Sequence, residues 1–291
     1  MVASRARRCA LFRMMKFLGR WLVIAATVCA ERSFAQVLYD GALGLPASQG
    51  WTYFATGGTQ ISTNGGVLLD TTAANSYQGG YSLTAPVVLN RTNGFTLAFT
   101  SRMIAEAHAN ANRAGCSVIL LAEDKHGIEL AFWTNTIFAQ SDSPLFTHAE
   151  ETNFSTATAF VDYALTLRPT SYVLLANGAI ILTGPIRDYE AFGGFPNVYV
   201  NPNFIFFGDD TTSAGGAFNL KKIILVTASK VSITRNRQIS WSGVSNQNYT
   251  VLTSSNLANW IPAQTVTSAT TNFSYTNNSS ATSQFFRVSY P

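Results

Sequence analysis

The stretch AGCSVILLAEDKHGIELAFW (residues 114–133) places two apolar runs on either side of a short polar segment. β-Branched and aromatic residues bounded by Gly and Asp are typical of strands, so the stretch predicts a β-hairpin. We expect a four-residue turn at residues 124–127, in which Asp124 and His126 are turn residues without a chemical role. A hairpin of this kind indicates a fold built from antiparallel sheets.

The predicted register sets Leu121 opposite Leu130 and Ile119 opposite Phe132. Directly opposed residues share a face, so these four side chains point into a core. The other face carries Val118, Leu120, Ala122, Glu129, Ala131 and Trp133. A solvent-facing side of an antiparallel sheet is normally polar, whereas this one is mostly apolar. We therefore expect that it is covered, or that it is the floor of a concave groove in which Glu129 and Trp133 bind a ligand.

Short strand patterns recur along the rest of the chain, broken by Gly, Asn, Asp and Pro. The strongest turn signal is Asn177-Gly178 between two apolar runs, which predicts a hairpin. Further strands are expected at residues 95–100, 161–167, 172–176, 179–183, 204–208 and 220–226. The alanine-rich residues 105–114 are interrupted by Asn and His, and we expect a loop there. Many short strands at this spacing predict an all-β sandwich or jelly roll.

The first 35 residues have the features of a secretory signal peptide. A basic segment precedes the apolar run at residues 21–30, and small residues at Ser33 and Ala35 favour cleavage before Gln36. The apolar run is too short to span a membrane. We therefore expect an extracellular or cell-surface location, with no transmembrane segment in the mature chain.

Removing this segment changes the charge of the protein. Residues 1–35 hold seven of the 19 basic residues and one of the 15 acidic ones, so residues 36–291 hold 12 basic and 14 acidic residues. This balance gives no reason to expect a nucleic acid as partner. One cysteine, Cys116, remains, and its apolar surroundings predict a buried thiol without a disulfide.

Several motifs in residues 36–228 resemble those of bacterial secreted "choice-of-anchor" domains. These motifs are LYDG (38–41), NRAGCSVILLAEDKHGIELAFW (112–133), LFTHAE (145–150), LTGPIRDY (182–189) and FGDDTTSA (207–214). The closing segment FIFFGDDTTSAGGAFNLKKIILV (204–226) is similar to the end of a concanavalin A-like or laminin G-like jelly roll. The resemblance implies a jelly roll with a ligand-binding concave face and implies no reaction.

Residues 229–291 form a second predicted unit, a small β-sandwich. Its pattern Y-x-V-x-x-S-x-x-L-x-x-W, from Tyr249 to Trp260, is followed by FFRV (285–288). The pattern resembles a fibronectin-like C-terminal module of exported bacterial proteins. The alternation of its Trp residues favours core packing over stacking on sugars. The predicted domains are thus a signal peptide (1–35), a jelly roll (36–228) and this module (229–291).

Candidate ligand-binding residues lie on and near the hairpin: Glu129, Trp133, His148, His108 and Arg113. A retaining glycosidase needs two carboxyl groups about 5–5.5 Å apart. The neighbours of Glu129 on its own strand face are Ala131 and Trp133, so a second acid on that strand is missing. Glu106, Glu150 or Asp162 could supply it from elsewhere, and a histidine could serve as the acid or base.

Asp209 and Asp210 follow a strand end and form the candidate metal site. Paired acids in a polar loop can bind Ca²⁺, which takes six to eight oxygens. An Asx-type turn that caps the strand end is the alternative. Arg113 and Arg187 could pair with these acids or hold a ligand carboxylate. No cofactor is expected other than this possible calcium ion.

The sequence therefore predicts a non-catalytic surface or matrix protein that recognises a polysaccharide through the concave face. The alternative is a glycan-active hydrolase or lyase that uses Glu129 with a histidine or a distant acid. A purely structural role, with the face covered by loops, is the third hypothesis.

Overall fold

The computed structural model describes residues 34–194, 196–227, 232–233, 238–242, 248–270, 272–278 and 284–289. These residues form four antiparallel sheets and three short 3-10 helices, η1 (Gly41–Leu43), η2 (Pro46–Gln49) and η3 (Val198–Val200), with no α-helix among them. In this part of the chain, no helix has the length and apolar character needed to cross a membrane.

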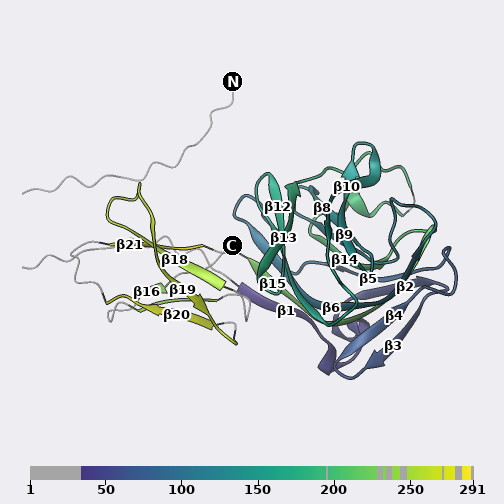
Figure 1. Cartoon of the computed structure of the whole chain (residues 1–291), viewed down its shortest axis with the longest axis horizontal. Helices are drawn as coiled ribbons and strands as arrows, with labels where there is room; N and C mark the ends of the chain where they lie inside the picture. Colours follow the sequence, from purple (N-terminus) through teal and green to yellow (C-terminus); the bar gives the residue numbers. More distant parts are fainter. Residues whose placement is uncertain are drawn as a thin grey trace, which may run out of the picture.

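Two large sheets make up the first and larger part of the fold (Figure 1). Sheet A runs in space as β13 (Ala179–Pro185), β12 (Ser171–Ala176), β11 (Val161–Leu167), β6 (Phe95–His108), β15 (Ala214–Thr227), β4 (Gly66–Asp70) and β3 (Thr59–Thr63), and β1 (Phe34–Asp40) also pairs with β15. Sheet B runs as β10 (Leu145–Asn153), β9 (Thr136–Asp142), β8 (Gly127–Phe132), β7 (Ser117–Leu121), β14 (Phe204–Asp209), β5 (Gln78–Thr84) and β2 (Thr52–Thr56).

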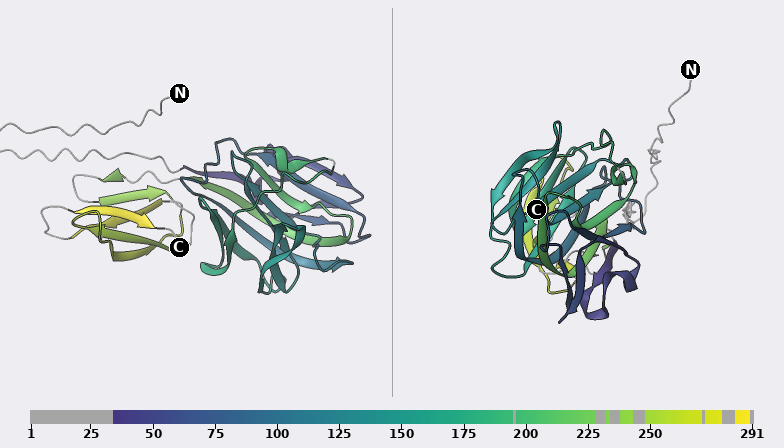
Figure 2. Two further views of the ribbon diagram at one scale, coloured as in Figure 1. Left: turned by 90° about the horizontal axis from the view of Figure 1, so that it is seen from above. Right: turned by 90° about the vertical axis from the view of Figure 1, so that its right-hand side faces the viewer.

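The remaining strands form two three-stranded sheets (Figure 2). One contains β16 (Ser232–Ile233), β17 (Gln238–Ser242) and β20 (Asn272–Thr276), and the other β19 (Ile261–Thr267), β18 (Asn248–Ser254) and β21 (Phe285–Ser289). Trp241 is buried there with Tyr249 and Phe273, which agrees with the expected core packing. The chain is thus an all-β protein with a jelly-roll sandwich and a small β-sandwich, as the sequence predicts.

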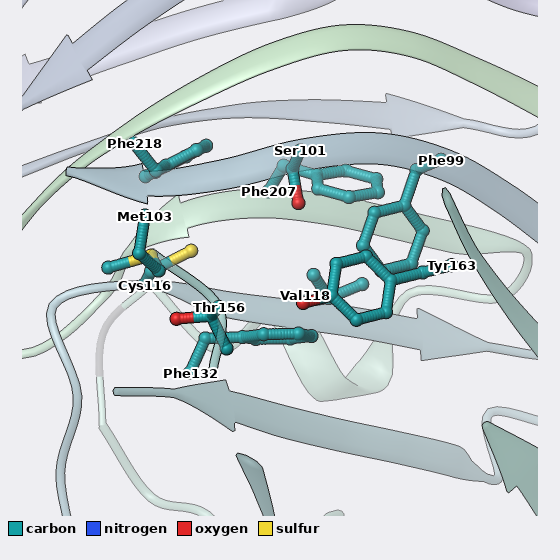
Figure 3. Close-up of a pocket in the computed structure, with 10 residues that line it drawn as sticks. All are labelled: Phe99, Ser101, Met103, Cys116, Val118, Phe132, Thr156, Tyr163, Phe207 and Phe218. Carbon is teal, nitrogen blue, oxygen red and sulfur yellow. The ribbon is translucent and has the colours of Figure 1, made fainter. Parts of the chain in front are cut away.

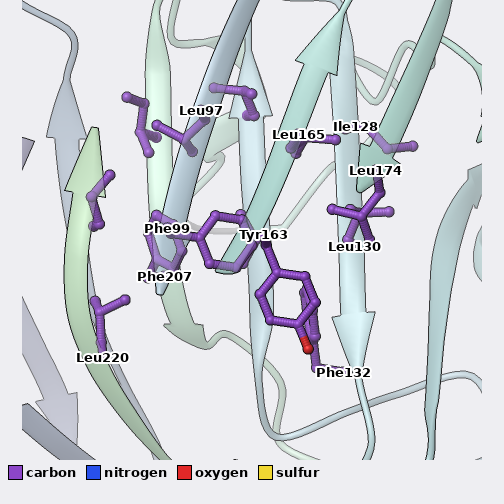
Figure 4. Close-up of a cluster of buried hydrophobic side chains, with 14 of the residues drawn as sticks. Leu97, Phe99, Ile128, Leu130, Phe132, Tyr163, Leu165, Leu174, Phe207 and Leu220 are labelled. Carbon is purple, nitrogen blue, oxygen red and sulfur yellow. The ribbon is translucent and has the colours of Figure 1, made fainter. Parts of the chain in front are cut away.

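The main core lies between sheets A and B (Figure 4). Alternating residues of each strand point into it, as period-two patterns dictate. Aromatic rings dominate its centre: Phe99 of sheet A stacks on Tyr163 at 5.0 Å and meets the edge of Phe207 of sheet B at 5.0 Å. Cys116 is a free and buried member of this core, as expected.

The core also contains a small internal cavity lined by residues of both sheets (Figure 3). Its volume of about 10 Å³ is close to the lower limit for one water molecule. The cavity is therefore too small to hold anything larger than a water molecule.

The predicted hairpin at Asn177-Gly178 is confirmed. Both residues have positive φ, 49° and 83°, as the favoured two-residue turn requires. The loop predicted at residues 105–114 is partly wrong, because β6 continues to His108 and pairs there with β15. Pairing with β15 along this part of the strand overrides the weak β-propensity of its alanines.

Of the predicted signal peptide, residues 1–33 lie outside the described part of the chain. Cleavage before Gln36 would remove the first two residues of β1. Gln36 and Val37 would still pair with Leu225 and Ile224 of β15, so β1 keeps its place in sheet A.

Candidate functional site

The β7–β8 hairpin forms where the sequence predicts it, but in a different register. Ile119 opposes Glu129 and Leu121 opposes Gly127, which replaces the predicted partners. The two registers differ by three residues along β8. An odd difference turns one strand over relative to the other, because side chains alternate between faces.

The turn explains the difference. The Ala122 amide donates to the His126 carbonyl over 2.9 Å, so the strands stay paired up to these residues. Lys125 takes a left-handed conformation with φ 65°. The loop therefore contains three residues, not the four that were predicted, and a left-handed residue at its end is usual for that length.

As a result, β7 shows the opposite faces from those predicted. Val118 and Leu120 point into the main core, whereas Ile119 and Leu121 lie on the outer face of sheet B. The prediction for β8 is confirmed, since Leu130 and Phe132 are in the main core. Glu129 and Ala131 lie on the outer face as expected, and Ile119 lies there with them instead of in the core.

The middle of this outer face is covered by the segment at residues 186–203. Its Tyr189 and Tyr199 are buried in one apolar cluster with Ile119 and Leu121. Phe146 of β10 stacks on Tyr189 at 5.8 Å between ring centres and also contacts Tyr199. Of the two alternatives drawn from the sequence, the covered face is found here.

Two tyrosine hydroxyls fix the segment to sheet B. Tyr189 Oη accepts the Glu129 amide hydrogen over 3.1 Å and donates to the Gln140 carbonyl over 2.7 Å. It thus links β8 to β9 where the two strands do not bond to each other directly. Tyr199 Oη donates to Glu129 Oε2. Sequence analysis missed both tyrosines, although LTGPIRDY contains Tyr189.

Glu129 is consequently enclosed, with only 3% of its surface exposed. Its Oε1 accepts from Ser117 Oγ over 3.4 Å, in addition to the Tyr199 bond. The pKa of this carboxyl is raised to about 8, chiefly by burial and also by the nearby acid Asp210, against the lowering effects of Tyr199, Arg113 and Ser117. At neutral pH Glu129 is mostly a neutral acid.

Glu129 has no acidic neighbour on its own strand, β8, but Asp210 is a second acid near it. It follows β14 and acts electrostatically on Glu129, while the Ser117 hydroxyl interacts with both carboxyls. Burial raises the pKa of Asp210, and Arg113 and hydrogen bonds partly oppose this. Glu129 and Asp210 are thus two acids that interact electrostatically near Ser117.

Four of the five predicted ligand-binding residues gather beside this acid pair, and we call them the Trp133 cluster: His108, Arg113, Trp133 and His148. The His108 ring stacks on Trp133 with 4.1 Å between centres and an angle of 3°. The His148 ring meets the edge of Trp133 at 5.4 Å. Trp133 Nε1 donates to the Arg113 carbonyl over 2.9 Å. The four residues come from separate parts of the chain, so only the fold brings them together.

The rim of the Trp133 cluster is accessible to solvent. The side chains of His108 and His148 are 32% and 22% exposed. His108 Nδ1 lies 2.9 Å from Glu106 Oε1, and burial raises the pKa of that carboxyl. His148 Nε2 lies 3.2 Å from Glu151 Oε2, but the angles do not make a hydrogen bond.

The loop at residues 109–116 places Arg113 over the sheet. A Cβ at Gly115 would lie 2.0 Å from the backbone of Gly215, so glycine permits this close approach to β15. Arg113 Nη1 donates to the carbonyls of Asn112 and Phe146, and its guanidinium lies 5.0 Å above the Phe146 ring. Its other guanidinium nitrogens donate to no described residue, while its backbone amide donates to the Asn110 carbonyl over 3.1 Å.

Asp209, the first acid of the predicted calcium site, faces the interior of the sandwich. Its carboxylate accepts from Thr71 Oγ1 over 2.6 Å and from the Thr211 amide over 3.1 Å. Burial raises its pKa to about 8. Among the described residues, no three His, Cys, Asp or Glu side chains are grouped to hold a metal. Calcium binding at Asp209 and Asp210 stays a prediction, and the Asx-type bond to Thr211 matches the alternative.

The other acids considered as partners of Glu129 have other roles. Glu150 pairs with Arg187 at 2.7 Å, and Asp162 accepts from Thr100 on sheet A, away from the outer face of sheet B. Arg187 therefore does not serve Asp209 or Asp210. Of the three acids named from the sequence as partners of Glu129, Glu106 alone adjoins the Trp133 cluster, through His108.

No protein-family model and no curated protein matches the sequence. Solved structures with a similar outline include a carbohydrate esterase from the Shiga toxin-encoding bacteriophage phi24B, with 11% identity, coverage of 67% of this chain and 100% of that chain, and a TM-score of 0.49. A Bacillus subtilis protein of unknown function with a galectin-like fold has 11% identity, coverage of 66% and 96%, and a TM-score of 0.42.

The exoplasmic/lumenal domain of VIP36 in its Ca²⁺/Man3GlcNAc-bound form is a third similar structure. It has 12% identity, covers 68% of this chain and 90% of its own, and has a TM-score of 0.41. At such identities and TM-scores, these likenesses assign no function to this chain. Its function has to be argued from its own residues.

Proposed function

We propose that this protein is an exported, non-catalytic carbohydrate-binding protein whose ligand contacts the Trp133 cluster. The observation that carries the proposal is the convergence of His108, Arg113, Trp133 and His148 at one end of the outer face of sheet B. Ligand sites typically combine aromatic surface with a few convergent polar groups, and this cluster provides both.

The chemistry of the cluster suits a sugar. Sugar rings have apolar C–H faces that can pack on an aromatic or imidazole ring, and hydroxyls that accept or donate hydrogen bonds. His108 is held flat by Trp133 and by Glu106, so its outer face is a preformed platform. A preformed platform reduces the entropy that binding costs.

In this proposal the ligand does not contact Glu129, which the sequence favoured most as a binding residue. Glu129 is 3% exposed and both of its oxygens accept hydrogen bonds from the protein, so it cannot reach a ligand while Tyr199 is in place. We propose that His108 and His148 make the contacts, and that Glu129 supports the floor beneath them.

Export and attachment belong to the same proposal. The basic and apolar segments of residues 1–35 support secretion. The resemblance to choice-of-anchor domains supports a place on the cell surface or in a matrix, with residues 229–291 as a spacer or attachment module. Mass spectrometry of the N-terminal peptide of the protein recovered from the culture medium tests the export, with a peptide that begins at Gln36 expected.

The binding test uses residues 36–291 on a panel of soluble and insoluble polysaccharides, with and without Ca²⁺. Retention on at least one glycan is expected, with His108→Ala and His148→Ala each weakening it by about tenfold or more. His126→Ala is the matched control, because His126 is the remaining one of the three histidines and lies in the β7–β8 turn, outside the Trp133 cluster. Equal retention by all four proteins would refute the site, and retention by none would refute the function.

A hydrolase is the second candidate, favoured by the acid pair of Glu129 and Asp210. A neutral acid beside a second carboxyl is an arrangement that general acid catalysis uses. The closed position of Tyr199 argues against it. The same panel decides: release of reducing ends that is lost in both Glu129→Gln and Asp210→Asn would establish an enzyme.

A further inference from the structure

β3 is the strand at one end of sheet A (Figure 1). It pairs with β4 on one side, from Thr59 opposite Asp70 to Thr63 opposite Gly66, without a register shift. No strand or bridge among the described residues pairs with its other side. An edge of this kind presents free N–H and C=O groups to any strand that can pair with it.

Natural proteins usually protect such edges with charged residues, proline or bulges. The other end of sheet A is protected, since β13 ends at Pro185 and pairs with β12 through a register shift. In sheet B, the edge strand β10 contains Glu150 and Glu151 and has two register shifts. By contrast, residues 41–69 contain no charged residue at all, and both β3 and β2, the other edge strand of sheet B, lie within them.

The sequence of β3, TQIST, is nearly symmetric about Ile61. If two copies pair antiparallel about this residue, Ile61 opposes Ile61, Thr59 opposes Thr63 and Gln60 opposes Ser62. β-Branched pairs on one face of a sheet are stabilising, and like charges placed opposite each other are not. A two-fold axis sets Ile61 opposite its own copy and each other residue of β3 opposite a second residue of the same strand, so a strand without charges brings no like charges together.

The hydrogen-bonding pattern agrees with this register. The two-residue loop between β3 and β4 closes on the Thr63–Gly66 pair, which is therefore hydrogen-bonded. Alternation along the strand turns the backbone groups of Thr59, Ile61 and Thr63 toward β4 and those of Gln60 and Ser62 outward. Two copies paired about Ile61 would then form hydrogen-bonded Gln60–Ser62 pairs on both sides of it.

We propose that a second copy of this chain pairs antiparallel with β3, which joins the two A sheets into one across a two-fold axis. Ile61, which is 59% exposed, would be buried against its counterpart. A five-residue strand pair is small compared with a standard interface, so the dimer should be weak, with a Kd on the order of 10 µM.

The test measures the molar mass of residues 36–291 by sedimentation at concentrations from about 1 to about 300 µM. A monomer–dimer equilibrium is expected, with Ile61→Lys raising the Kd at least about tenfold because two ammonium groups would meet at the axis. Ile180→Lys is the matched control, since Ile180 is 57% exposed on β13 at the opposite edge of the same sheet. Circular dichroism verifies that both variants are folded.

A cross-link gives an independent readout of the register. In the proposed pair, Ile61 occupies a non-hydrogen-bonded position, where Cα atoms lie about 4.5 Å apart, within reach of a disulfide. Oxidised Ile61→Cys should therefore run as a covalent dimer, whereas Ile180→Cys should not, and the native Cys116 is buried. A wild-type monomer at every concentration, open-ended oligomers, or equal effects at both edges would overturn the proposal.

Discussion

Glu129 illustrates how one buried side chain makes the stability of the protein depend on pH. Its pKa rises from 4.5 to about 8 on folding, chiefly through burial. Between these values the folded chain retains a proton that the unfolded chain releases. The stability linked to Glu129 is therefore fully present below about pH 4.5 and is lost as pH rises toward 8. The loss is on the order of 5 kcal/mol.

Urea unfolding between about pH 5 and pH 9 measures this loss, with Glu129→Gln as the informative variant. The amide cannot ionise, so the variant should lose less stability across this range than the wild type. Part of the decline should remain, because the pKa of Asp209 is also raised to about 8. Glu123→Gln, at an exposed carboxyl on the β7–β8 turn, is the control. A decline equally steep in Glu129→Gln and in the wild type would contradict the account.

The face on which a residue lies could be predicted better than its surroundings. Alternation correctly placed Glu129 on the outer face and Leu130 and Phe132 in the core. For Ile119 and Leu121 the same reasoning gave the wrong face, because the conformation of Lys125 shortens the turn. Turn length is a local backbone property that composition does not determine, and an odd error inverts a whole strand.

At the scale of elements, the segment at residues 186–203 decides what the outer face of sheet B can do. The Tyr189 hydroxyl satisfies two buried backbone groups, the Glu129 amide and the Gln140 carbonyl. Tyr189→Phe would leave both without a partner. We expect it to lower the free energy of unfolding by about 2–4 kcal/mol.

Urea unfolding tests the Tyr189→Phe prediction, and hydrogen exchange at the Glu129 amide locates the effect. Tyr53→Phe is the matched control, because its hydroxyl donates to the Gly58 carbonyl over a longer 3.3 Å in a half-buried place. We expect a cost of at most about 1 kcal/mol for this control. If Tyr189→Phe and Tyr53→Phe lower the free energy of unfolding equally, the two hydrogen bonds of the Tyr189 hydroxyl do not hold the covering segment in place.

The sequence could not predict this cover, or the convergence of the Trp133 cluster. His108 and Trp133 lie 25 positions apart along the chain, at the end of β6 in sheet A and just after β8 of sheet B, and their stacking depends on how the two sheets are placed. Asp210 was considered as a metal ligand and not as the partner of Glu129, because a strand pattern describes neighbours on one strand. Both results depend on long-range geometry that only the assembled sandwich defines.

At the scale of the whole molecule, the described strands fall into two groups that do not share a sheet. No ladder joins β16–β21 to β1–β15 among the described residues. The buried cluster around Trp241 also has no member in common with the main core. Groups of strands with separate cores usually unfold as separate cooperative units.

We therefore expect two unfolding transitions in calorimetry of residues 36–291. The smaller one belongs to residues 229–291, since a core of about sixty residues is only marginally stable. Trp241→Ala removes a large buried ring and should cost about 3–5 kcal/mol, enough to abolish the smaller transition. The larger transition should keep its midpoint, and residues 36–228 alone should reproduce it. If instead Trp241→Ala shifts both transitions, or the shorter chain does not fold, the two groups stabilise each other and the predicted domain boundary near residue 228 is wrong.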